Sequence, residues 1–145
     1  MHSDDRQLKI INKAAQLGWQ IATAESCTGG MVATRLTDPA GSSAAFAGGL
    51  VTYSNQMKRS LLNVPSSCLN TYGAVSDNTV SAMAQGCLEK TGAQLAVSIS
   101  GVAGPGGGSD AKPVGTVHFG LIAAREHAQR AKVIFDGSRD DIREQ

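Results

Sequence analysis

The segment Ala24-Glu25-Ser26-Cys27-Thr28-Gly29-Gly30 joins a predicted strand to a predicted helix. The apolar run 19–24 before it indicates a short buried strand, and residues 31–36 after it indicate a helix. The first N–H groups of that helix would point back at the turn and stabilise a negative charge. We expect the N-cap at Thr28, with Gly29 and Gly30 allowing a ligand to approach the backbone. The segment alone also fits a capped turn with a small buried thiol.

A second segment, residues 48–58, repeats the order of strand, turn and helix and carries Tyr53 and Lys58. Its N-cap is expected at residues 54–55, which puts Lys58 in or near the first turn of a helix over residues 56–62. There the helix dipole and partial burial both lower the pKa of a lysine, from about 10.4 toward about 7–8. Such a lysine can act as a general base. A solvated surface lysine is the alternative.

A third predicted strand, residues 95–100, stops at a glycine-rich loop over residues 101–109. Backbone N–H groups of such a loop can bind a phosphate or a carboxylate. The loop has neither the Gly-Lys-Ser/Thr of a Walker loop nor the G-x-G-x-x-G spacing of a dinucleotide site. A flexible connection is the alternative, but the position directly after a buried strand favours a site.

The other periodic segments predict helices around a mixed sheet. An amphipathic helix ends at Gly18, and another begins after Ser76 and ends at Gly92. Strands over residues 114–123 and 131–135 flank a charged turn and indicate an antiparallel hairpin. The order of these elements predicts an α/β fold, specifically a three-layer α/β/α sandwich with a mixed sheet.

Composition restricts the class of protein. The chain has 145 residues, which fits a single domain over residues 1–145, and 13 Lys and Arg stand against 12 Asp and Glu. It contains no basic run that would suggest a nucleic-acid partner and no apolar stretch near 18 residues that would suggest a membrane partner. The three cysteines form no C-x-x-C, so neither a metal site nor a disulfide framework is indicated. We expect a cytoplasmic protein.

Together these segments resemble the CinA C-terminal domain family. The resemblance runs from about residue 8 to the end of the chain. It rests on residues 24–30, Gly41-Ser42-Ser43, Val51-Thr52-Tyr53-Ser54-Asn55 with Lys58, Tyr72-Gly73-Ala74-Val75-Ser76, residues 98–108, Lys112-Pro113-Val114-Gly115-Thr116-Val117 and Gly137-Ser138-Arg139-Asp140.

The resemblance implies about five strands and the activity of the family's stand-alone nicotinamide mononucleotide deamidases. These hydrolyse the carboxamide of nicotinamide mononucleotide to nicotinate mononucleotide and ammonia, in pyridine nucleotide salvage. The catalytic positions map onto Ser26 as nucleophile, with Lys58 and Tyr53 as activating partners. No cofactor is implied, the expected partner is the small-molecule substrate, and we expect a homo-oligomer. The helix that starts at Ser138 stops with the chain, so we expect that the last helix is missing.

The chemistry of amide hydrolysis assigns roles to further residues. The tetrahedral oxyanion needs preorganised donors, for which the backbone N–H groups of residues 27–30 are candidates. The proton for ammonia would come from Lys58, directly or through the Tyr53 hydroxyl. The 5′-phosphate needs cations or N–H groups, and Arg139 has the strongest case as a bidentate partner. The expected substrate-binding residues are Thr28, Gly29, Gly30, Ser100, Gly101, Ala103, Gly104, Lys112 and Arg139.

Several alternatives stay open. Cys27 is intrinsically the better nucleophile, but one of two neighbouring side chains faces the core, and we prefer Ser26. Glu25 either orients Lys58 or a ligand hydroxyl, or forms a structural salt bridge. His118 pairs with no recognisable acid and nucleophile, which argues against a Ser-His-Asp triad. A nucleotide-binding or regulatory module without turnover, and an amidohydrolase acting on another small amide, are the alternative functions.

Overall fold

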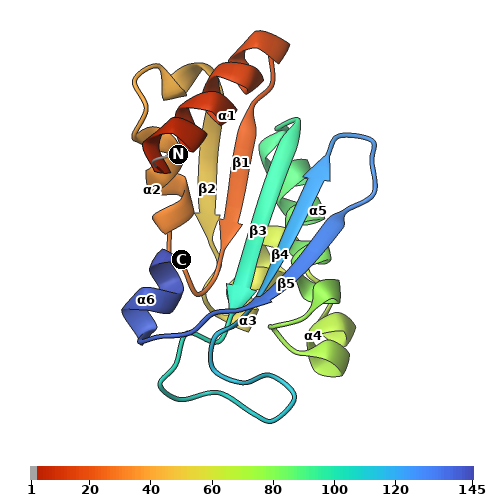
Figure 1. Cartoon of the computed structure of the whole chain (residues 1–145). Coiled ribbons are helices and arrows are strands. Elements are labelled where there is room, and N and C mark those ends of the chain that lie inside the picture. Colours follow the sequence, from red (N-terminus) through yellow and green to blue (C-terminus); the bar gives the residue numbers. More distant parts are fainter. Residues whose placement is uncertain (1–2) are drawn as a thin grey trace.

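Five strands form one mixed sheet in the computed structural model, which describes residues 3–145; Met1 and His2 of the predicted domain lie outside the described residues. The strand order is β2-β1-β3-β4-β5 (Figure 1). β1 runs parallel to β2 and β3, whereas β4 is antiparallel to both β3 and β5. The strands are β1 (Ile21–Glu25), β2 (Phe46–Val51), β3 (Leu95–Gly101), β4 (Thr116–Ala123) and β5 (Gln129–Ile134).

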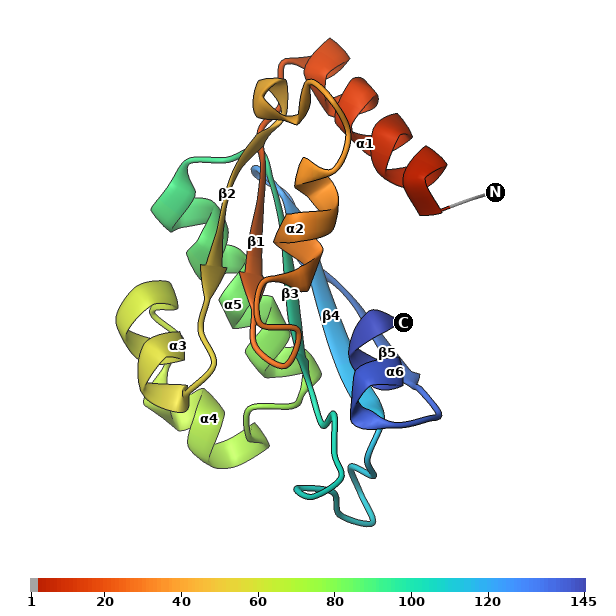
Figure 2. The same ribbon diagram turned by 90° about the vertical axis from the view of Figure 1, so that its left-hand side faces the viewer.

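Helices cover both faces of this sheet. Figure 2 shows α1, α2 and α6 on one side, and α3, α4 and α5 on the other. The first group comprises α1 (Ser3–Leu17), α2 (Met31–Thr37) and α6 (Arg139–Glu144). The second comprises α3 (Asn55–Leu62), α4 (Ser66–Tyr72) and α5 (Asp77–Thr91), and a short 3-10 helix spans Ser42–Ala44. This arrangement confirms the predicted three-layer α/β/α fold with a mixed, five-stranded sheet.

Most elements lie within a few residues of their predicted bounds, and the antiparallel hairpin of β4 and β5 is confirmed. Two details differ. Helix α4 was not predicted, because its short polar sequence has no strong apolar period. The N-cap of α2 is Gly30, with φ 107°, and not Thr28. A left-handed backbone of this kind suits glycine, because it has no Cβ.

Each face of the sheet has its own core. Buried alanines of β1 and β3 face α5, and this layer includes Leu62 at the end of α3 and Met83 of α5. The two helices cross at Gly86, where an added Cβ would lie 1.8 Å from the Leu62 carbonyl oxygen. On the opposite face one cluster joins α1, β1 and α2, and a second joins Cys27 to Ile142 of α6. Apolar burial on both faces therefore fixes α3 and α6 against the sheet.

The topology determines where a site can form. Because β1, β2 and β3 are parallel, their carboxyl ends lie at the same edge of the sheet, and the turns after them converge there. Hydrogen bonds join these ends directly: Thr52 N–H donates to Glu25 O (2.8 Å), and Ser26 N–H donates to Ile99 O (2.9 Å). The three segments singled out in the sequence therefore meet in space.

Among residues 3–145, no helix is long and apolar enough to cross a membrane. The same residues contain no group of three or more His, Cys, Asp or Glu side chains placed to hold a metal ion.

Candidate active site

Ser26 and Lys58 form a buried pair at the carboxyl edge of the sheet. The Lys58 side chain is 1% exposed, and its Nζ donates to Ser26 Oγ at 2.9 Å. It also donates to the carbonyl oxygens of Thr52 (2.9 Å) and Tyr53 (3.0 Å). All three acceptors are neutral oxygens. The pair therefore consists of a hydroxyl and an amine within hydrogen-bond distance of each other. Two backbone carbonyl oxygens hold the amine in place.

The start of α3 brings Lys58 to this position. Ser54 is the N-cap, and its hydroxyl accepts from Met57 N–H at 3.1 Å, so Lys58 is the fourth residue of the helix. Burial lowers the pKa of Lys58 to about 8, and the negative charge of a Cys27 thiolate opposes this shift. The lowered pKa agrees with the sequence-based expectation, and the cause is desolvation of the ammonium.

Glu25, directly before Ser26, has a different role from those expected. Its carboxylate is fully buried and accepts from Thr28 Oγ1 (2.6 Å) and from the N–H groups of Val32 and Ala33 (both 2.9 Å). A longer contact comes from Thr23 Oγ1 at 3.4 Å. Among residues 3–145, Glu25 has no contact with Lys58 and forms no salt bridge, so these two expectations were wrong, and the contact with a ligand hydroxyl stays a prediction. It takes over the capping of α2 that we assigned to Thr28, because its side chain reaches the free N–H groups of that helix.

Cys27 is turned into the core. It is 7% exposed and belongs to the apolar cluster that includes Ile99 and Ile142. Burial raises the pKa of the Cys27 thiol. A thiol with a raised pKa holds less of the reactive thiolate near neutral pH. This environment favours Ser26 over Cys27 as the nucleophile.

A cleft of about 280 Å³ opens in front of the pair. It brings together most residues predicted from the sequence: Ser26, Tyr53, Lys58, Ser100, Gly101, Ala103, Gly104 and Arg139. It is also lined by Cys27, Ala74, Val75, Val102, Gly106 and Gly107. A more apolar groove of about 330 Å³ lies between α1, α2, α6 and the sheet, and neither Ser26 nor Lys58 lines it. The smaller cleft is therefore the candidate active site, because it contains the serine–lysine pair.

Tyr53 and Arg139 meet at the rim of this cleft. Arg139 Nη2 donates to the Tyr53 hydroxyl (3.1 Å), and Nη1 donates to the Gly104 carbonyl oxygen (2.7 Å). The Tyr53 side chain is 59% exposed. Tyr53 therefore contacts the Ser26–Lys58 pair through its backbone carbonyl, while its phenol lies beside the guanidinium. The arrangement places one cation and one aromatic ring at the mouth of the cleft.

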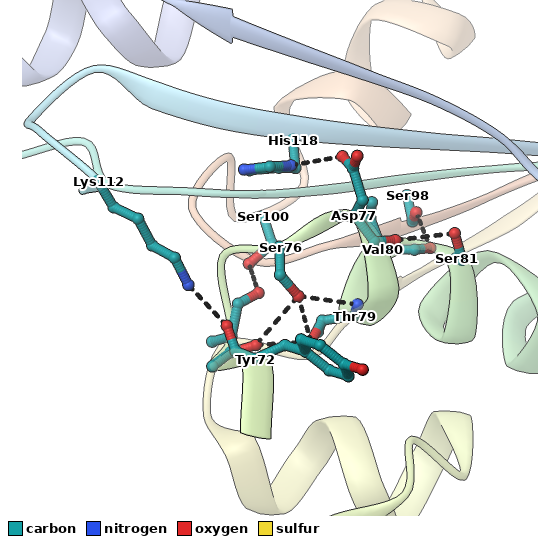
Figure 3. Close-up of polar contacts among 12 residues, drawn as sticks. Tyr72, Ser76, Asp77, Thr79, Val80, Ser81, Ser98, Ser100, Lys112 and His118 are labelled. Atoms are coloured by element: carbon teal, nitrogen blue, oxygen red, sulfur yellow. Dashed lines mark hydrogen bonds and ion pairs between the residues drawn. The ribbon is translucent and has the colours of Figure 1, made fainter. Parts of the chain in front are cut away.

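Four of the predicted substrate-binding residues do not line the cleft. The Thr28 hydroxyl donates a hydrogen bond to the Glu25 carboxylate, and the Gly29 N–H donates to Ser26 O at 3.0 Å. Gly30 is the N-cap of α2. Lys112 donates to the Tyr72 carbonyl oxygen at 2.6 Å, which ties the glycine-rich loop to the end of α4 (Figure 3).

The segment 72–76, which includes the cleft residues Ala74 and Val75, is held by polar side chains (Figure 3). Besides the Lys112 contact, Thr79 Oγ1 donates to Gly73 O (2.6 Å) and Ser100 Oγ donates to Ala74 O (2.8 Å). Three consecutive carbonyl oxygens are thus each bound by a side chain. The Ser100 hydroxyl, at the end of β3, therefore has a structural hydrogen-bond partner in the Ala74 carbonyl oxygen.

His118 pairs with an acid that the sequence did not indicate, but with no nucleophile, in agreement with the expectation that it forms no triad. Its Nδ1 lies 2.7 Å from Asp77 Oδ1. The two residues are 41 positions apart, so nothing in the local sequence indicated the pair. Among residues 3–145, no serine or cysteine side chain hydrogen bonds to the imidazole. The pair therefore connects β4 to the start of α5 and does not complete a triad.

Sequence reasoning did not assign Ala74, Val75 or Arg143 to the site. Residues 74 and 75 stand in a quoted motif, but only the fold brings them opposite Ser26. Arg143 Nε donates to the Cys27 carbonyl oxygen at 3.0 Å, across 116 residues of sequence. Contacts over such separations leave no local pattern.

Fold and cleft together define an α/β protein with a serine–lysine pair at the carboxyl edge of its parallel strands. Residues 4–145 match the CinA C-terminal domain. The chain belongs to the CinA C-terminal domain family.

Individual relatives cover the chain to different extents. A nicotinamide-nucleotide amidohydrolase, PncC, of Enterobacter agglomerans is 53% identical over 126 residues, which are 87% of this chain and 77% of that protein. A CinA-like protein of Mycolicibacterium gilvum is 50% identical over 145 residues, 99% of this chain but 34% of the relative. The chain thus spans about a third of the length of the CinA-like proteins it matches.

Solved structures agree with the fold. The crystal structure of the competence/damage inducible protein CihA from Agrobacterium tumefaciens superposes with a TM-score of 0.94 at 44% sequence identity. The match covers 97% of this chain and 86% of that one.

Proposed function

We propose that this protein is a nicotinamide-nucleotide amidohydrolase, which converts nicotinamide mononucleotide and water to nicotinate mononucleotide and ammonia. The observation that carries the proposal is the 2.9 Å contact between Lys58 Nζ and Ser26 Oγ at the bottom of a cleft. The 53% identity to a relative named for this activity supports the substrate.

Lys58 has the properties of a base for Ser26. With a pKa of about 8, about a tenth of the molecules carry a neutral Lys58 at pH 7, against roughly 0.03% for an unperturbed lysine. Neutral Lys58 accepts the Ser26 proton as Oγ attacks the carboxamide carbon, which forms a C–O bond and a tetrahedral oxyanion. The serine–lysine pair is a known variant of the triad arrangement.

The second half of the reaction reverses the proton path. The Lys58 ammonium returns its proton to the amide nitrogen as the C–N bond breaks and ammonia leaves. Water then attacks the acyl-enzyme with Lys58 as base, and nicotinate mononucleotide departs while Ser26 regains its proton. Because the Tyr53 phenol binds Arg139 at the rim, we assign both proton transfers to Lys58 and the phenol to the substrate side of the cleft.

Backbone N–H groups are the candidates for stabilising the oxyanion. Gly29 is excluded, since its N–H is occupied by Ser26 O. Among residues 3–145, the N–H groups of Cys27, Thr28 and Gly30 have no backbone partner, and of these three residues Cys27 lines the cleft, so its N–H is the donor we assign to the oxyanion. Loss of one oxyanion donor typically raises the barrier by about 2.7–4 kcal/mol.

Arg139 is the residue we assign to the substrate phosphate. It is the one arginine among the residues that line the cleft, and it lies at the rim where a phosphate remains partly solvated. The glycine-rich residues 101–107 add backbone N–H groups close to it. Arg–phosphate contacts are charge-assisted and frequently bidentate.

Ammonia release from nicotinamide mononucleotide tests the proposal, with nicotinate mononucleotide quantified by chromatography. We expect turnover by the wild type and by Cys27→Ala, and none by Ser26→Ala or Lys58→Ala. Nicotinamide and its riboside, which lack the phosphate, should be poor substrates. A folded wild type that binds the mononucleotide without turning it over would instead indicate a binding or regulatory module. Equal turnover of the phosphate-free compounds would indicate a broader amidohydrolase.

A further inference from the structure

Helix α6 contacts the turns that build the cleft, and it does so through side chains spaced along its length. Arg139, at its first turn, binds the rim at Gly104 and Tyr53. Arg143, one turn later, binds the Cys27 carbonyl oxygen at 3.0 Å. Figure 2 shows α6 beside the sheet, on the same side as α2. The helix thus connects the turns after β1, β2 and β3.

The carbonyl groups of the nucleophile turn show what Arg143 adds. Four consecutive carbonyl oxygens, those of residues 25–28, each accept a hydrogen bond. Three of the donors are backbone N–H groups. Thr52, directly after β2, donates to Glu25 O, Gly29 donates to Ser26 O, and Met31 donates to Thr28 O. The fourth donor is the Arg143 guanidinium, at Cys27 O. Within the part of the chain that the structure describes, residues 3–145, Arg143 is therefore the one side chain that binds a carbonyl oxygen of this turn.

A second observation places the guanidinium against the turn. An added Cβ at Gly29 would lie 3.4 Å from Arg143 Nη2, so the guanidinium packs against the residue that follows Thr28. The Arg143 side chain is half-buried, which excludes part of the competing water. A charged donor to a buried carbonyl makes a stronger hydrogen bond than a neutral donor does.

We propose that Arg143 is a positioning residue, which holds the Cys27–Thr28 peptide in the orientation that the reaction at Ser26 requires. By binding Cys27 O, Arg143 fixes the residue that follows Ser26 and lines the cleft, whose N–H we offer to the oxyanion. This inference rests on the proposed function, because it assigns Arg143 to the same reaction without contact to the substrate.

The structure predicts that the fold survives the loss of this side chain. Ile142 is 4% exposed in the cluster with Cys27, and Ser138 and Asp141 form a capping box at the start of α6. An exposed ion pair between Arg35 and Glu144 (3.0 Å) joins the same helix to α2. Helix α6 therefore keeps its packing and its cap when Arg143 is replaced.

Kinetics of Arg143→Ala, Arg143→Lys and Arg35→Ala on nicotinamide mononucleotide test the role. We expect kcat of Arg143→Ala to fall roughly 10- to 100-fold with KM changed less than about threefold, because orientation and not binding is lost. Arg143→Lys keeps a donor and should retain most of the activity. Millimolar guanidinium should restore part of the activity of Arg143→Ala. The control Arg35→Ala removes the exposed ion pair between α2 and α6 and should stay within about twofold of the wild type.

A fluorophosphonate probe separates this inference from the proposed substrate, because it reports on Ser26 without the mononucleotide. Slower Ser26 labelling in Arg143→Ala, restored by guanidinium, supports the inference even if the wild type does not hydrolyse nicotinamide mononucleotide. Equal labelling and equal kcat in Arg143→Ala and the wild type would overturn it. An equal loss of kcat and of labelling in Arg35→Ala would also overturn it, because Arg143 would then only help to hold α6 against the rest of the fold. A wild-type Ser26 that is inert to the probe would overturn both the serine–lysine assignment and this inference.

Discussion

Two buried charged side chains lie on either side of Ser26, and they are held in opposite ways. Glu25 is 0% exposed and Lys58 is 1% exposed. The Glu25 carboxylate accepts from two helix N–H groups and two hydroxyls. The Lys58 ammonium donates to one hydroxyl and two carbonyl oxygens, and no carboxylate within residues 3–145 forms an ion pair with it. The carboxylate is stabilised by the N-terminus of a helix, whereas the ammonium has neutral acceptors and no counter-ion among residues 3–145.

This difference separates a structural charge, that of Glu25, from the charge that we propose to be reactive, that of Lys58. N–H groups at a helix N-terminus stabilise an anion, so the Glu25 carboxylate completes the N-terminus of α2. An ammonium without a counter-ion is destabilised by burial, and its proton becomes easy to remove. Perturbed groups of this kind are concentrated at functional sites. Removing each charge should therefore damage a different property of the protein.

Replacement of Lys58 should produce the largest effect, and on catalysis alone. We expect Lys58→Met to lower kcat by about 10³- to 10⁴-fold, because Ser26 loses the group that accepts its proton. The free energy of unfolding should change by less than about 2 kcal/mol, since an unpaired buried ammonium is removed together with its hydrogen bonds. Ammonia release and urea unfolding of the same preparation measure both quantities. A stable Lys58→Met variant with wild-type turnover would show that Lys58 is not the reactive charge.

Replacement of Glu25 should show the reverse pattern. Glu25→Gln keeps the shape but turns an amide NH₂ toward donors, which leaves a buried N–H or hydroxyl unsatisfied. We expect a loss of about 2–3 kcal/mol in the free energy of unfolding, measured by urea denaturation. The kcat of the folded fraction should fall less than about tenfold. If the variant were as stable as the wild type but inactive, Glu25 would have to act in the chemistry.

The pH dependence sharpens the comparison, because it follows Lys58. With a pKa of about 8, kcat/KM should rise about tenfold per pH unit at low pH and level off above about pH 8. The folded state releases this proton at lower pH than the unfolded chain does, so the Lys58 contribution to stability should rise with pH between about 8 and 10.5. The buried Cys27 and Cys87 thiols, whose pKa is raised by burial, act in the opposite direction above about pH 9. The difference between the urea midpoints of the wild type and Lys58→Met, measured at pH 7.5 and 9.5, therefore checks the sign for Lys58. Lys58→Met should lack this rise, and a rise that persists would assign it to another group.

Cys27 should give the smallest effect, although it adjoins the nucleophile. Cys27→Ala keeps the carbonyl that binds Arg143 and removes only a buried sulfur, so kcat should stay within about threefold of the wild type. The free energy of unfolding should fall by about 1 kcal/mol for the lost packing. Thermal unfolding and ammonia release measure the two changes. A larger loss of kcat than in Ser26→Ala would identify the thiol as the nucleophile.

The sequence predicted the layers and the mixed sheet, because apolar periodicity is a local property and the alternation of strands and helices favours parallel pairing. It predicted the pKa direction of Lys58, since the start of α3 and its burial were both legible in residues 48–58. It misjudged Glu25, because strand register decides whether that side chain faces Lys58 or α2. It missed the Asp77–His118 and Arg143–Cys27 contacts, which span 41 and 116 positions and follow only from tertiary packing.

The crossing of α3 and α5 bears on how much change this protein can tolerate during evolution. Gly86 lies in the layer beneath the sheet and lines no part of the cleft, yet an added methyl group would overlap the Leu62 carbonyl of the helix that carries Lys58. A single carbon at this crossing would push α3 outward and draw the amine away from the hydroxyl. A random-mutagenesis screen for lost turnover should therefore recover substitutions at Gly86 beside those at the cleft, and its inactive variants would keep every catalytic side chain.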